Sequence, residues 1–65
     1  MKIKYFQETD TLRIEFNKGV ITETHDLEEN MLQDMDADDN ICSMTIEHAK
    51  QRADIAHFSF EQIAA

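Results

Sequence analysis

Two segments in the first part of the chain alternate between apolar and polar residues. Residues 2–6 alternate lysines with apolar side chains, and residues 11–16 place Leu12, Ile14 and Phe16 on one side and polar groups on the other. Alternation with a period of two is typical of a strand that has one face on a core and the other in water. Both segments are therefore predicted to be half-buried β-strands.

Three later segments also have the composition of strands. Residues 20–27 are rich in β-branched side chains, although their alternation is imperfect, and residues 31–36 form a further short segment between two polar clusters. Residues 41–47 alternate strictly, which predicts that Cys42, Met44 and Ile46 face the core. These patterns add three predicted strands to the first two.

Short polar clusters separate the five segments, at residues 7–10, 17–19, 28–30 and 36–40. They are rich in Asp and Asn, which tolerate positive φ angles and hydrogen-bond to their own backbone. The chain has one Gly and no Pro, so Asp and Asn supply nearly all of its turns. Strands joined by such short connections are expected to be antiparallel neighbours. The five strands are therefore predicted to form a single antiparallel meander.

A meander of this kind has one apolar face that another element must cover. Residues 48–55 are rich in Ala and in long unbranched side chains, which predicts a short helix of about two turns. Residues 58–63 are ambiguous: Phe58 and Phe60 alternate as in a strand, the preferred interpretation, but Ser59–Gln62 also has the pattern of a capping box that opens a helical turn.

The expected fold class is therefore α+β. It consists of a small antiparallel β-meander of about five strands, with a short C-terminal helix packed on or beside the sheet. Residues 1–65 are expected to form a single small domain, because 65 residues supply only one core.

Charge narrows the possible functions. The net charge is −8, and the residues between Gly19 and Ala49 include nine acidic side chains but no Lys or Arg. Phosphate backbones and anionic membranes attract Lys and Arg, so the charge argues against nucleic acids and membranes as partners. A basic protein partner, a cation, or solubility alone would each explain the acidic block.

A chain of this size needs further stabilisation, because a small domain buries little apolar area. Cys42 is the only cysteine and cannot form an internal disulfide, and no Cys/His set has the spacing of a structural zinc site. Self-association is the remaining common route. No stretch is apolar enough to cross a bilayer, and the first residues lack a signal-peptide core, so a cytoplasmic location is expected.

Several segments together resemble the DUF2283 family of small, mostly bacterial proteins of unknown function. They are Met1–Tyr5, Glu8–Leu12 with Ile14, and Asp34–Ile41 followed by Met44, Ile46 and Ala49–Arg52. The resemblance implies the meander with a terminal helix. It implies no activity, substrate or catalytic residue, because none is established for the family.

One position departs from the family pattern. The acidic turn usually contains a Gly where this chain has Asp39. Aspartate can adopt the left-handed conformation at some cost, so the hairpin is expected to form nevertheless.

The acidic turn is the sharpest candidate for metal chemistry. Asp36, Asp38, Asn40 and Glu47 have the ligand spacing of an EF-hand calcium loop. However, Ile41 stands where that loop needs Gly, and a strand over 41–47 would carry Glu47 far from the turn. A β-hairpin turn is the stronger interpretation, with loose magnesium or manganese binding as an open alternative.

The histidines and the cysteine are the candidates for catalytic or metal-binding chemistry. Glu23 and His25 share a strand face and would form a metal site or an acid–base pair if pairing brought Glu47 or His48 beside them. Histidines scattered over a surface are the commoner case. Cys42 is expected to be buried and inert, so it forms no dyad with His48.

Methionines offer one further clue. Met31 and Met35 share a strand face, with Leu32 on the other. They either belong to the core or form an apolar patch on the second side of the sheet. In the latter case another subunit could provide the cover.

Two main hypotheses follow. The first is a non-enzymatic, self-associating protein-interaction module, and the second is an acidic neutraliser of a basic protein, such as the antitoxin of a toxin–antitoxin pair. Weak binding of a divalent cation or small ligand is a further alternative. An enzyme is not expected, because no nucleophile, base and orienting group converge; Glu47 and His48 would be its most reactive residues. No catalytic, cofactor-binding or metal-binding residue is predicted, and no cofactor.

Overall fold

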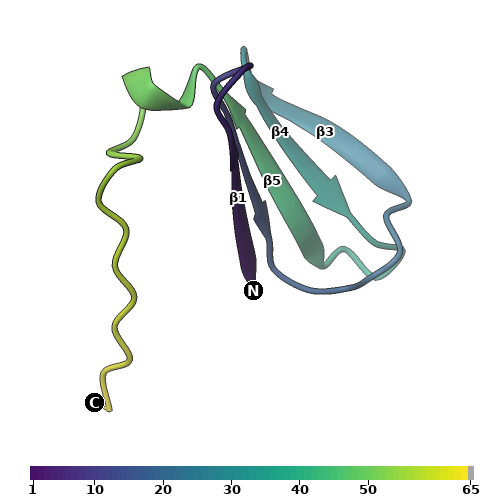
Figure 1. Ribbon diagram of the computed structural model, residues 1–65. Helices are drawn as coiled ribbons and strands as arrows, with labels where there is room; N and C mark the ends of the chain where they lie inside the picture. Colours follow the sequence, from purple (N-terminus) through teal and green to yellow (C-terminus); the bar gives the residue numbers. More distant parts are fainter. Residues whose placement is uncertain (65) are drawn as a thin grey trace.

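The computed structural model describes residues 1–64 (Figure 1). Five strands and one short 3₁₀ turn follow each other along the chain: β1 (Lys2–Phe6), β2 (Thr11–Glu15), β3 (Glu23–Glu28), β4 (Met31–Met35), β5 (Ile41–Glu47) and η1 (Ala49–Gln51). All five predicted strands are present. The largest difference in bounds is in β3, which begins at Glu23 rather than at residue 20.

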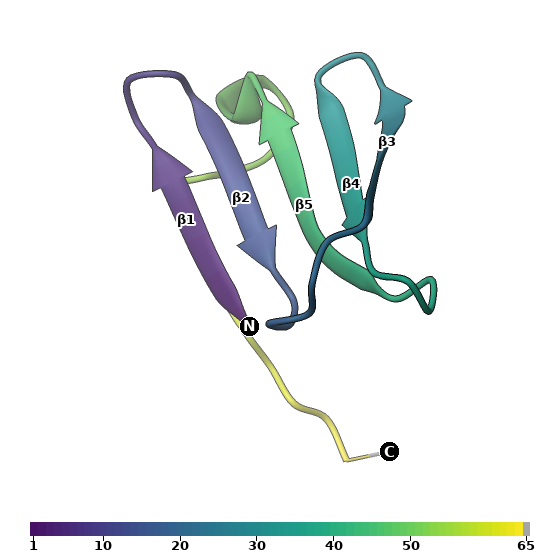
Figure 2. The ribbon, with the colours of Figure 1, turned by 90° about the vertical axis from the view of Figure 1, so that its right-hand side faces the viewer.

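The strands form one antiparallel sheet in the order β1-β2-β5-β4-β3 (Figure 2). The five-stranded antiparallel meander is thus confirmed in outline, because β1–β2, β3–β4 and β4–β5 are paired neighbours. The strand order differs at one point: β2 pairs with β5 and not with β3. Residues 16–22 therefore cross to the far side of the sheet, and β1 and β3 become its two edges.

The register of β1, β2 and β5 gathers apolar side chains on one face. Ile3, Ile14 and Met44 form one row across these three strands. The adjacent row consists of Tyr5, Leu12 and Ile46. We call this the apolar face. The opposite, polar face carries the rows Lys4, Arg13, Thr45 and Glu15, Ser43, Asp34.

The crossing segment from β2 to β3 covers Cys42. The backbone amide of Phe16 donates to the carbonyl of Cys42 at 2.8 Å. A Cβ atom on Gly19 would lie 3.0 Å from the Cys42 sulfur, so the glycine is needed for this close approach. Cys42 is only 2% exposed, which confirms the prediction that it is buried. Removal from water raises the pKa of its thiol, with the nearby carboxylates adding to the effect.

The predicted helix over residues 48–55 is wrong. Only η1 forms there, and it spans three residues. His48 has a φ angle of 55°, in the left-handed region, so the chain turns sharply after β5 instead of entering a helix. A two-turn helix is also marginal by itself, because nucleation costs more than one turn recovers. Within residues 1–64 the fold is therefore mostly β rather than α+β.

Residues 52–64, which we call the tail, follow η1. The expected strand or helical turn over 58–63 is absent from the described chain: these residues adopt neither. After turns within residues 52–56, the tail instead runs extended beside the sheet and continues past the N-terminal end of β1 (Figures 1 and 2). Phe58 is 69% exposed and Phe60 is 74% exposed, so the tail leaves its aromatic side chains in water.

Aspartates and asparagines shape the turns, as predicted. Asp10, Asn30 and Asp39 all have positive φ angles. In the turn between β4 and β5, one carboxylate oxygen of Asp36 accepts hydrogen bonds from the amides of Asn40 and Asp38, both at 2.9 Å. These bonds stabilise the ionised carboxylate and lower the pKa of Asp36.

We predict that Asp39→Gly stabilises the protein by about 0.5–1 kcal/mol, because Asp39 has a φ angle of 63° and glycine adopts that conformation without a Cβ clash. Urea unfolding followed by circular dichroism measures the change. Asp38→Gly is the matched control and should destabilise, because Asp38 has no positive φ to relieve. Equal effects of the two substitutions would contradict this explanation.

Candidate functional site

The apolar face is covered only in part. Among the apolar side chains of residues 1–64, only Cys42 and Ala49 are buried. Leu12, Ile14 and Met44 are half-buried, and Ile3 is 37% exposed. The single layer therefore lacks the second layer that normally covers a sheet. The tail approaches this face but does not close it.

A groove separates the apolar face from the tail. Its floor is formed by four apolar-face residues, and its wall by tail residues; together they are Ile3, Tyr5, Leu12, Ile14, Ala53, Asp54, Ile55, His57 and Phe58. The space between them is about 200 Å³. It adjoins a wider hollow of about 600 Å³ beside Met1, Ile3, Phe58 and Phe60. We call the two together the sheet–tail groove, and its lining is mainly apolar.

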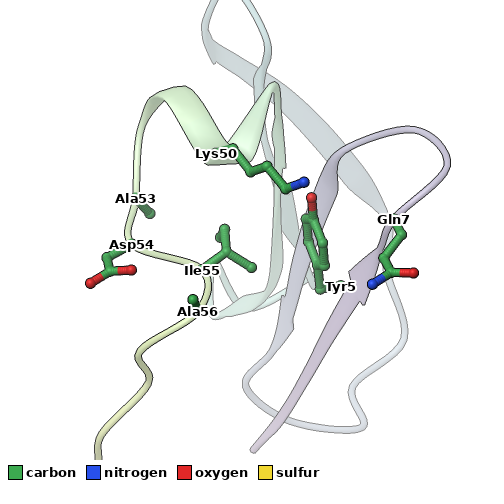
Figure 3. A pocket seen from close by; sticks show the side chains of 7 residues that line it. All are labelled: Tyr5, Gln7, Lys50, Ala53, Asp54, Ile55 and Ala56. Atoms are coloured by element: carbon green, nitrogen blue, oxygen red, sulfur yellow. The ribbon is translucent and has the colours of Figure 1, made fainter.

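A third hollow continues the sheet–tail groove toward η1 and is shown in Figure 3. The Tyr5 ring and the Ile55 side chain face each other across the gap, and Lys50 extends from η1 toward the Tyr5 hydroxyl (Figure 3). This hollow has a volume of about 500 Å³. Gln7 and Asp54 also line it, so the groove changes from apolar to polar toward this end.

Asp10 anchors this end of the groove. Its carboxylate accepts a hydrogen bond from the Tyr5 hydroxyl at 2.7 Å and another from the Lys50 amide at 3.1 Å. Its backbone carbonyl accepts the Ala49 amide at 3.0 Å. The hydrogen bond from Tyr5 lowers the pKa of Asp10, and the same bond raises the pKa of Tyr5. One residue thus ties the β1–β2 turn to η1 and sets where the tail begins.

The polar face carries a connected network centred on Arg13 and Asp34. The Arg13 guanidinium donates to Asp34 at 3.3 Å, to Thr45 at 3.1 Å and to Ser43 at 3.1 Å. Asp34 is 8% exposed and also accepts the hydroxyls of Ser43 at 2.6 Å and Thr24 at 2.7 Å. The Ser43 bond, followed by those from Thr24 and Arg13, lowers the pKa of Asp34. All of these contacts are internal, so the network is structural.

Sequence reasoning placed Asp34 in a solvated acidic block and did not find this network. Its members come from β2, β3, β4 and β5, and only the pairing register brings them together. The sheet–tail groove was missed too, because it depends on where the tail runs. The one local sequence signal of the groove was the alternation of Phe58 and Phe60, whose side chains are exposed in the structure.

The structure brings only some of the candidate residues together. The ring of His25 lies 2.9 Å from the Glu23 carboxylate on edge strand β3, so this predicted pair forms and is exposed. Glu47 and His48 do not join it, because β4 lies between β3 and β5. Cys42 and His48 lie near opposite ends of β5 and form no dyad.

The EF-hand spacing is not realised. The Asp36 carboxylate is occupied by its own turn, and β5 carries Glu47 to the other end of the sheet, where its amide donates to Asn30. Across residues 1–64, no three His, Cys, Asp or Glu side chains are grouped so that they could hold a metal ion.

The strand register shows on which face of the sheet Met31 and Leu32 lie. Met31 pairs with Ile46 and extends the apolar face across β4. Leu32 pairs with Thr45 on the polar face, where it is half-buried. Apolar groups thus occur on both faces of β4, but the larger apolar area is on one side of the sheet. Within the described chain, no helix has the length and apolar character that a membrane crossing requires.

These features define a small antiparallel β-sheet protein with a partly open apolar face. The sequence matches the DUF2283 family, described as a protein of unknown function, over residues 2–50. The chain therefore belongs to the DUF2283 family, which confirms the resemblance seen in its sequence. The match includes all five strands and ends within η1, before the tail. No curated protein and no solved structure matches the chain.

We predict that Asp34→Asn costs about 2 kcal/mol at neutral pH, because it weakens hydrogen bonds to a charged group that is nearly buried. The pKa of Asp34 is lower when folded than its ordinary value of 3.8. Its stabilisation is therefore complete above that value and is lost as the pH falls through the folded pKa.

Urea unfolding at several pH values tests this. The stability gap between wild type and Asp34→Asn should narrow as the pH falls below about 4. Asp26→Asn, at an exposed aspartate of β3, is the control and should leave stability almost unchanged. A gap that stays constant down to the acid transition would contradict the assigned role of Asp34.

Proposed function

We propose that this protein is a small, non-enzymatic, self-associating protein-interaction module. One observation carries the proposal: the chain exposes 5271 Å² of surface. A folded monomer of 7.6 kDa exposes about 4,300 Å². The excess is about 1,000 Å² per chain, and a second layer over the apolar face would remove an area of this order from water.

The size of this excess suits a stable dimer. Two chains that each buried about 1,000 Å² would form an interface of about 2,000 Å², at the upper end of the standard range. Much of the exposed apolar surface belongs to the tail and to the start of β1. Phe58, Phe60, Ile63 and Met1 are each between 69% and 78% exposed. Exposed apolar patches of this kind mark interaction surfaces.

The form of the groove supports a protein ligand more than a small substrate. It is open along its length, and its walls come from a sheet and an extended segment. Substrate pockets usually enclose most of the ligand and aim a few polar groups at it. The polar groups that line the groove are engaged with partners: Tyr5 donates to Asp10, and the ring of His57 lies 3.1 Å from the Asp54 carboxylate.

We predict a dimer of twice the 7.6 kDa chain mass at high micromolar concentration, measured by size-exclusion chromatography with light scattering. Added salt should preserve or strengthen it, because the contact is apolar and two chains of charge −8 repel each other. A monomer at every concentration would overturn the proposal.

Matched substitutions locate the contact. Ile3→Ser, on the apolar face, should weaken the dimer about tenfold, because it removes much of one apolar side chain from the interface. Leu27→Ser, at a comparably exposed leucine of β3, should leave association unchanged. Equal effects of the two would place the interface elsewhere.

A second candidate function is neutralisation of a basic protein, as by the antitoxin of a toxin–antitoxin pair. Edge strand β3 favours it, because all six of its residues are exposed and Glu23, Asp26 and Glu28 are acidic. An acidic sheet edge offers both backbone hydrogen bonds and charge complementarity to a basic segment. Part of this charge is already paired, since Arg52 contacts Glu28 and His25 contacts Glu23.

For this second function we predict that an affinity pulldown at low salt recovers a basic protein that high salt releases. Glu23→Gln combined with Asp26→Asn should reduce recovery severalfold, because it removes two charges from the β3 edge. Glu8→Gln, in the turn at the opposite side of the sheet, is the control. Binding that does not respond to salt would contradict an electrostatic contact.

A further inference from the structure

We infer that the β1 edge of one chain binds residues 58–61 of a second copy as a sixth, antiparallel strand. This inference rests on the proposed self-association and names its contact. β1 is an edge strand that pairs with β2 on one side only. Its other side presents backbone amides and carbonyls that another strand can pair with. Four of its five residues are exposed.

The apolar side chains of the tail match those of β1. In an antiparallel pairing, Phe58 lies opposite Tyr5 and Phe60 lies opposite Ile3, all on the apolar face. The two aromatic rings would extend the existing rows of that face by one strand. In doing so they would cover Ile3, which is 37% exposed, and leave water themselves.

The polar side chains match in the same register. Glu61 lies opposite Lys2, and Ser59 lies opposite Lys4, on the polar face. Opposite charges directly across two strands stabilise the pairing. A parallel arrangement that kept the aromatics on the apolar face would put Glu61 opposite Phe6 instead. Charge therefore selects the antiparallel direction.

The rival way to close this edge is to pair two β1 strands. An antiparallel β1–β1 contact would bring Lys2 and Lys4 of the two copies together, and like charges in this position destabilise a sheet. Lysines on edge strands commonly prevent such self-pairing. The same lysines favour a segment that carries a glutamate, which the tail provides at Glu61.

The position of the tail favours a second copy over the chain's own edge. Tail residues between Ala53 and Phe58 line the groove over the apolar face of β1 and β2, and no residue of the tail up to 64 pairs with the β1 edge. The tail then extends beyond the N-terminal end of β1, away from the sheet (Figures 1 and 2). Ile63 there is 76% exposed. A two-fold axis lets two chains exchange these segments reciprocally.

A charge exchange within the full-length chain tests the register. Glu61→Lys should raise the dimer dissociation constant about fivefold, because it replaces attraction to Lys2 by repulsion. Lys2→Glu combined with Glu61→Lys should restore the original value. Lys18→Glu combined with Glu61→Lys is the control and should not restore it. Analytical ultracentrifugation measures all four proteins.

A cross-link between two differently tagged chains tests the contact directly. One chain carries Lys4→Cys and the other carries Ser59→Cys; mild oxidation of the mixture should give a mixed disulfide. Cys42 can stay, because it is buried and its raised thiol pKa keeps it unreactive at neutral pH. Asp26→Cys, at an exposed position of the opposite edge strand, is the control and should not cross-link to Ser59→Cys.

Each outcome decides the question. A mixed disulfide together with rescue by the charge exchange supports the inference. If the wild type dimerises but neither the charge exchange nor the cross-link gives the expected result, this contact is overturned. The proposed self-association is then unaffected. A third protein carries both Lys4→Cys and Ser59→Cys. If it forms an internal disulfide while the mixture gives no mixed disulfide, the exchange is overturned, because the tail would then close its own edge. A wild-type monomer overturns the proposed function and this inference together.

Discussion

The pairing of β2 with β5 joins the two parts of this chain, the β1–β2 hairpin and the β3–β4–β5 unit. It places Leu12 beside Ile46 and Ile14 beside Met44, and so creates the middle of the apolar face. The same register brings Arg13 beside Thr45 on the other side. Without this pairing, neither the apolar rows nor the Arg13–Asp34 network would exist. The segment between β2 and β3 would also not have to cross β5, where it now covers Cys42.

A single layer of strands has two faces, and in this chain one is stabilised by hydrogen bonds while the other is only partly covered. On the polar face, the nearly buried Asp34 carboxylate receives hydroxyl and guanidinium hydrogen bonds, so burial there costs little. The apolar face receives one 3₁₀ turn and a tail that leaves a groove open over it. The groove is the part of this face that the tail leaves open. The proposed self-association would cover it.

The sequence predicted the strands because alternation is a local property. Each run of alternating residues in β1, β2 and β5 identifies its own strand, and the Asp- and Asn-rich clusters identify the turns. Strand order was harder, because β2 pairs equally well, by pattern, with β3 or β5. Tertiary contacts decide in favour of β5, whose apolar residues complement those of β2, whereas β3 has the polar composition of an edge.

The helix and the site were less predictable for other reasons. Alanine-rich composition favoured a helix after Glu47, but the left-handed His48 and the anchor at Asp10 allow only one 3₁₀ turn. In the sequence, Asp34 cannot be distinguished from the acidic residues around it, because its hydrogen-bond partners lie on other strands and produce no pattern near residue 34. The groove depends on the path of the tail, which has no regular hydrogen-bond pattern for a sequence to reveal.

The end of the family match at residue 50 has a consequence for how this protein could diversify. The five strands and the Asp10 anchor lie within the matched region, whereas the exposed aromatics of the tail lie outside it. If the tail makes the contact proposed above, the sheet and one side of that contact are encoded in consecutive stretches of the chain. A different tail on the same sheet would then change the contact while the scaffold remains constant.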